Sequence, residues 1–158
     1  MKYKGLIISI SVTVLIIGLI VWGNKIQTNN MIMYKDTQIA CLTNGHQRVA
    51  EHIHPTLNII VDGENETIPA NIGITSDCMP ELHTHDTTGE IHAESFLPGR
   101  ISNFNLGDFF TIWDRKVERD GYDLEITQDG EIKNSVEEVK FIDHSRIELK
   151  YTSVKIES

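Results

Sequence analysis

Residues 5–22 form an unbroken apolar run without a single charge (GLIISISVTVLIIGLIVW). A helix of that length measures about 27 Å, close to the roughly 30 Å hydrocarbon core of a bilayer. The chain holds 23 acidic residues, and none of them precedes Asp36. The run therefore predicts a transmembrane anchor at residues 1–23, a polar stalk at 24–37 and a folded domain at 38–158.

A cleavable signal peptide is the alternative to an anchor. Its apolar region is usually about 7 to 15 residues long and is followed by small residues in an A-x-A-like pattern. Gly23, Asn24 and Lys25 offer no such site, which favours an uncleaved anchor. Because Lys2 and Lys4 precede the run, we expect a single-pass protein of the cell membrane with a cytoplasmic N-terminus and an extracytoplasmic domain.

The chain carries a formal net charge of −9. Phosphate binding needs clustered Lys and Arg, and the sequence has no such cluster, which argues against a nucleic-acid partner. The membrane is the expected partner of the N-terminal run, and the sequence identifies no protein partner. The remaining length suits one domain and is too short for a two-domain enzyme.

Short extended segments and one amphipathic helix alternate along this domain. The helix is predicted at residues 105–115, where Asn105 is a suitable N-cap and Asp108 a suitable capping acid. Strand patterns occur at 57–61, 67–69, 82–86, 91–96, 122–127, 136–142 and 147–151. The order predicts an α+β domain in which one helix covers a small mixed or antiparallel sheet, β-grasp-like, with an all-β sandwich or a cupin-like barrel as alternatives.

The two cysteines, Cys41 and Cys78, both lie on the predicted exported side. That compartment permits disulfides, and closing a loop of about 37 residues stabilises a small domain by about 4 kcal/mol in the chain-entropy model. We therefore expect a Cys41–Cys78 disulfide. Two free thiols or a metal thiolate are the alternatives.

Five of the seven histidines fall into two tight groups, and a glutamate accompanies the second group. Residues two apart on a strand point to the same face, so members of each group can converge. These residues are His52 and His54 in the first group, and His83, His85, His92 and Glu94 in the second. His46 and His144 stand alone and are predicted to be surface or loop residues.

The turn at Thr88-Gly89 decides how the second group is arranged. A two-residue loop would place His85 opposite His92 and His83 opposite Glu94, all on one face. A three-residue loop with Gly89 as a bulge would shift the register by one and send the two pairs to opposite faces. The sequence leaves both arrangements open.

Imidazole and carboxylate groups together suit a transition metal such as Cu or Zn. We therefore expect a metal site formed by His83, His85, His92 and Glu94, with His52 and His54 as further ligands. The alternative is a non-enzymatic interaction module in which the histidines form a structural hydrogen-bond network. The spacing of His83, His85 and Glu90 also matches the H-x-H-x4-E motif of cupins, so a small cupin-like metalloenzyme is a third possibility, although the sequence favours no enzymatic activity.

Four strings of the sequence resemble an uncharacterised family of membrane-anchored or secreted proteins of bacteria and archaea. They are HIHPTLNIIVDG, IPANIGI, LHTHDTTGEIHAE and NLGDFF, which match the family's HxHxxLxIxVDG, IPAxIGI, LHTHDxxGxIHxE and TLGxFF motifs. The chain departs from the family's pattern at Asn105, where Thr is usual, and at Thr56, and neither change touches a histidine. The resemblance implies an exported single domain and carries over no activity.

Overall fold

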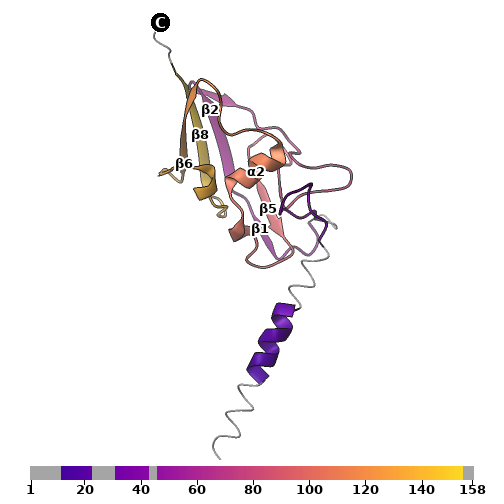
Figure 1. Cartoon of the computed structure of the whole chain (residues 1–158). Coiled ribbons are helices and arrows are strands. Elements are labelled where there is room, and N and C mark those ends of the chain that lie inside the picture. The colour runs from indigo at the N-terminus through magenta and orange to yellow at the C-terminus, as the bar shows by residue number, and fades with distance from the viewer. Residues whose placement is uncertain (1–11, 23–30, 43–45, 155–158) are drawn as a thin grey trace, which may run out of the picture. The chain divides into compact units, whose positions relative to one another are not determined.

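The computed structural model describes residues 12–22, 31–42 and 46–154 (Figure 1). The chain divides into two compact units, Met1–Ile32 and Met33–Ser158. In the first unit, residues 12–22 are helical. Within the described ranges, no helix combines the length and the apolar character needed to cross a bilayer. Much of the predicted anchor and stalk, at 1–11 and 23–30, lies outside the described residues, so both stay predictions.

The second unit contains two sheets and a helix, which confirms the predicted α+β class. The smaller sheet has the order β1-β5-β4, and the larger sheet the order β3-β2-β8-β6-β7. Their bounds are β1 Glu51–Ile53, β2 Thr56–Val61, β3 Glu64–Glu66, β4 Leu82–His83, β5 His92–Ser95, β6 Tyr122–Gln128, β7 Glu131–Lys133 and β8 Arg146–Ser153. Neither sheet closes on itself, so the barrel and all-β alternatives are wrong.

The larger sheet is mixed. Its central strands β2 and β8 run parallel, with Thr56 opposite Arg146, whereas β3, β6 and β7 pair antiparallel with their neighbours. In Figure 1, β8 lies between β2 and β6. The β2–β3 hairpin is followed by a helix, and the last strand, β8, returns beside β2. This is the β-grasp-like arrangement expected from the sequence.

The β2–β3 hairpin is tighter than predicted. Asp62 and Gly63 both have positive φ, 49° and 89°, and Val61 pairs directly with Glu64. Two consecutive left-handed residues form the turn whose twist matches that of the flanking strands. The returning strand therefore begins at once and occupies Glu64–Glu66, instead of the predicted residues 67–69.

The predicted helix is present as α2 (Leu106–Trp113). Asn105 and Asp108 form a capping box, in which each side chain accepts a hydrogen bond from the backbone N–H of the other residue. The buried apolar face of the helix consists of Leu106, Phe109, Phe110 and Ile112. This face is part of the main hydrophobic core. A helix that is capped and buried in this way holds the middle of the chain against the sheets.

The strand predicted at residues 136–142 is wrong. The chain there forms a short 3-10 helix, η2 (Val136–Glu138), followed by an irregular segment. The carbonyl of Val139 accepts a hydrogen bond from Leu106 N–H, and Lys140 forms a bridge with Asn105. The apolar residues Val136, Val139 and Phe141 are buried without joining a sheet, whereas Ile142 is exposed.

The predicted disulfide between Cys41 and Cys78 is confirmed. Backbone pairing continues beside it, since Cys41 bridges to Pro80 and Glu81 N–H donates to the carbonyl of Ala40. The disulfide therefore fixes the segment around residue 41 next to the start of β4.

Candidate metal centre

The smaller sheet collects histidines on one of its faces. His52 lies directly opposite Glu94, and His83 directly opposite His92. Directly opposed residues share a face, and so do residues two apart on one strand, such as His92 and Glu94. His54 and His85 follow β1 and β4 and extend the same alternation beyond the strand ends. The three strands thus bring all six predicted ligands together.

Neither predicted hairpin register is realised, because β4 and β5 are joined by residues 84–91 instead of a tight turn. Thr84 Oγ1 donates a hydrogen bond to the carbonyl of Pro69 at 2.9 Å, which draws the chain away from β5. It then returns along β2, where the carbonyl of Gly89 accepts a 2.9 Å hydrogen bond from Leu57 N–H. The loop is long because it pairs with the larger sheet.

Nitrogen and oxygen atoms of the cluster approach closely. Glu94 Oε1 lies 2.6 Å from His46 Nδ1 and 2.9 Å from His52 Nε2. The ring nitrogens of His83 and His85 are 3.1 Å apart, and those of His52 and His92 are 3.2 Å apart. Four sets of three residues have donor atoms within 4.8 Å of one another: His46/His83/His85, His52/His54/His92, His46/His52/Glu94 and His83/His92/Glu94.

Glu94 is a fully buried carboxylate with only one of its oxygens satisfied. Its Oε2 has no hydrogen-bond partner among the described residues. Glu81 is equally buried, but it accepts hydrogen bonds from Ala40 N–H, Ser95 Oγ and Arg100 Nε, and the Arg100 guanidinium balances its charge. Buried charged groups are normally paired or bound to a metal, and among the described residues only imidazoles contact the Glu94 carboxylate.

His83 is held in the form that a metal ion requires. Its Nδ1 donates a 2.8 Å hydrogen bond to the carbonyl of Pro80, which leaves the lone pair on Nε2 facing the cluster. Burial lowers the pKa of His83 to about 3, although the bond to Pro80 raises it. Burial also lowers the pKa of His85 and of His92, and repulsion between imidazoles adds to the effect. These rings are therefore neutral at pH 7.

His46 is an exposed turn residue, as predicted, and it also belongs to the cluster. Its ring contacts Glu94 and stacks at 5.9 Å on the ring of His52. The sequence contained one indication of this position. His46 follows shortly after Cys41, and β4 begins shortly after Cys78, so a Cys41–Cys78 disulfide brings the two segments together. His144 is 81 % exposed and belongs to none of the four sets, as predicted for a surface residue.

No family model, curated protein or solved structure matches the chain. The resemblance to membrane-anchored or secreted proteins of bacteria and archaea stays a prediction. The side chains of the site are six imidazoles and one buried carboxylate, a donor set that can ligate a borderline-soft divalent metal ion.

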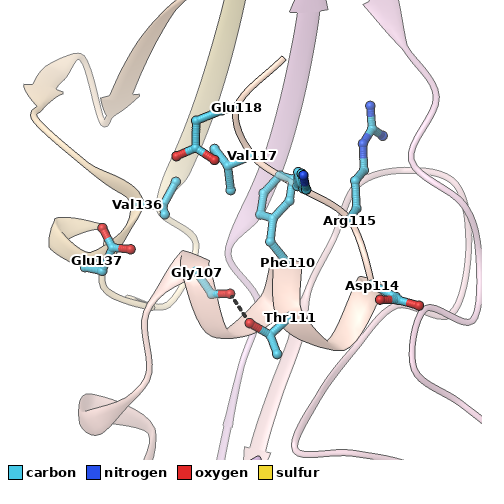
Figure 2. A pocket seen from close by; sticks show the side chains of 10 residues that line it. Gly107, Phe110, Thr111, Asp114, Arg115, Val117, Glu118, Val136 and Glu137 are labelled. Carbon is cyan, nitrogen blue, oxygen red and sulfur yellow. Dashed lines mark hydrogen bonds between the residues drawn. The ribbon is translucent and has the colours of Figure 1, made fainter. Parts of the chain in front are cut away.

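A concave region lies beside α2 and η2 (Figure 2). The charged residues Asp114, Glu118 and Glu137 on its wall are exposed, and Arg115 is paired with Glu66. Thr111 Oγ1 donates to the carbonyl of Gly107 within its own helix, as the dashed line in Figure 2 shows. The described residues that line this region thus provide no converging set of unsatisfied polar groups, in contrast to the histidine cluster.

Proposed function

We propose that this protein binds a divalent transition metal ion, Cu(II) or Zn(II), at the histidine cluster, and that it handles or senses metal at the cell surface. The ligands come from the predicted residues and His46. The proposal places the domain outside the cell, held at the membrane by residues 1–23. The disulfide is consistent with such an oxidising compartment.

The buried carboxylate of Glu94 carries the proposal. An ionised carboxylate is costly to bury unless it is paired or coordinates a metal. The rings of His46 and His52 contact Oε1, and Oε2 receives nothing from the described residues. A divalent cation at this position would neutralise Glu94 and use the imidazole lone pairs at the same time.

Direct metal binding by the full-length chain tests the proposal. The chain is purified in mild detergent and stripped with a chelator while its disulfide stays oxidised. After Cu(II) or Zn(II) is added back and the excess is removed, it should hold the metal at stoichiometric level. When free metal exceeds Kd about 100-fold, the expected stabilisation is about 2.7 kcal/mol, a rise in Tm of roughly 10 °C for a domain this size. Absence of stoichiometric binding would contradict the proposal.

The double variant His46→Asn/His92→Asn is the sharpest control, because it removes one member from each of the four ligand sets. We expect it to lose the metal-induced rise in Tm. His144→Asn, at an exposed histidine outside these sets, should keep the rise. An equal rise in both variants would place the metal elsewhere.

A structural hydrogen-bond network is the second candidate function for the cluster. The ring nitrogens of His83 and His85 lie at hydrogen-bond distance, as do those of His52 and His92. In an interaction module built on such a network, the metal-free double variant would be less stable than the metal-free wild type. Added metal would leave the Tm of both proteins unchanged. The same Tm series therefore separates the two functions.

A further inference from the structure

We infer that the cluster holds two metal ions, each on its own histidine triad, with the Glu94 carboxylate bridging them. This inference rests on the proposed function and adds the number of ions and the way they are joined.

The number of donors is the first argument. Zn(II) usually takes four ligands, and in open sites three protein ligands leave a position free. The cluster offers six imidazoles and a carboxylate, more than one such ion can use. Two of the four ligand sets share no residue: triad 1 is His46, His83 and His85, and triad 2 is His52, His54 and His92. Each triad alone supplies the three nitrogens of an open site.

The position of Glu94 is the second argument. Both remaining ligand sets contain Glu94 together with two histidines, one from each triad. These pairs are His46 with His52, and His83 with His92. Glu94 therefore stands where the two triads meet. A carboxylate at such a junction can give one oxygen to each ion.

The two oxygens of Glu94 have different surroundings. Oε1 already contacts one ring of each triad, at 2.6 Å from His46 Nδ1 and 2.9 Å from His52 Nε2. Oε2 is buried and lacks a partner among the described residues, so it is available for coordination.

Sheet order supports the same division. Glu94 lies on β5, the middle strand, with β1 on one side and β4 on the other. Triad 1 takes His83 and His85 from the end of β4, whereas triad 2 takes His52 and His54 from β1 and its extension. A second carboxylate, Glu90, lies 3.4 Å from His92 Nε2 and adds negative charge that favours two cations in close proximity.

Stoichiometry tests the inference separately from the proposed function. Calorimetric titration of the metal-free, full-length chain with Zn(II), together with elemental analysis after dialysis, should give two ions per chain. One ion per chain would overturn the bridged pair and leave the proposed function intact. No bound ion would overturn both.

Single-triad variants give the second readout. His85→Asn and His54→Asn alter an exposed and a half-buried side chain, and each should reduce the count from two ions to one. The control His144→Asn should bind two. If either triad variant kept two ions, the assignment of the triads would be wrong.

Copper(II) electron paramagnetic resonance tests the bridge itself. Two bridged Cu(II) ions are spin-coupled, so the integrated signal of the loaded wild-type chain should fall well below its copper content. In each single-triad variant the signal should account for all bound copper. A full signal from wild-type chain with two coppers would show two separate sites and overturn the bridge.

Discussion

Glu94 Oε1 lies 2.6 Å from His46 Nδ1, although 48 residues separate the two in the chain. The Cys41–Cys78 disulfide makes this contact possible, because it joins the segment that precedes His46 to the segment that leads into β4. His46 itself lies in a turn, and the crosslink holds the segment that precedes it beside β4.

Glu94→Gln should separate metal binding from folding. The amide keeps the size of the side chain and removes a buried carboxylate whose Oε2 has no partner among the described residues, so the metal-free variant should be at least as stable as the wild type. Its metal affinity should fall at least tenfold, by about 1.4 kcal/mol or more, because a ligand oxygen is lost. Calorimetric titration and urea unfolding measure the two effects.

Glu81→Gln is the matched control for that variant. It leaves the half-buried Arg100 without a charged partner, so we expect a loss of about 3 kcal/mol in the free energy of unfolding. Zn(II) stoichiometry measured at low temperature should be unchanged. If the two glutamine variants behaved alike, the distinction between a structural and a ligating carboxylate would be wrong.

Replacing both cysteines by serine should lower the free energy of unfolding of the metal-free chain by about 4 kcal/mol, since the crosslink closes a loop of 37 residues. Metal affinity should fall as well, because His46 is no longer held beside β4. Urea unfolding with and without reductant checks the first effect. A loss below about 1 kcal/mol would show that backbone pairing alone holds this segment.

Gly89→Ala should destabilise the protein more than Gly63→Ala. Both glycines have positive φ, 83° and 89°, which costs any other residue about 1 kcal/mol. A Cβ at Gly63 meets open space, whereas a Cβ at Gly89 collides with the carbonyl oxygen of Leu57. Gly89→Ala should also weaken metal binding, because the loop that sets the β4–β5 register would shift. Equal losses of stability in the two variants would contradict the role of this close approach.

Glu66 should give the domain a pH-dependent contribution to stability. Burial raises the pKa of Glu66, but hydrogen bonds from Arg115 and Arg119 outweigh this and lower it below the usual 4.5. The unfolded chain therefore takes up a proton at a higher pH than the folded chain, and the contribution is present above pH 4.5 and is lost as pH falls below it.

Glu66→Gln should accordingly be less stable than the wild type at pH 7, by no more than about 1 kcal/mol because the ion pairs are partly exposed. The difference should shrink as pH falls below 4.5, which urea unfolding at several pH values can follow. A constant difference would assign the effect to packing instead of charge.

The sequence predicts those parts of the fold that local rules decide. Asn105 and Asp108 mark the start of α2 because a capping box needs only residues three apart. The disulfide follows from an even cysteine count in a domain predicted to be exported. The sequence also identifies six ligand candidates, because alternation on a strand places residues two apart on one face.

Long-range pairing is what the sequence does not predict. The β4–β5 register depends on Thr84 bonding to Pro69 and on Gly89 bonding to Leu57, and no local pattern indicates either contact. Val139 makes a further contact that no local pattern indicates. Its carbonyl accepts a hydrogen bond from Leu106 N–H at the start of α2, and not from a neighbouring strand. Such contacts form only after distant segments have met.

The parallel pairing of β2 with β8 has a consequence for the order in which the protein is made. Asn58 and Glu148 lie side by side across these strands, 90 positions apart, so the centre of the larger sheet cannot form until the C-terminal end of the chain is available. Every cluster residue, in contrast, lies between His46 and Glu94. A nascent chain therefore exposes every cluster residue well before the core closes, and under the proposed function metal present at that moment would act as a folding template.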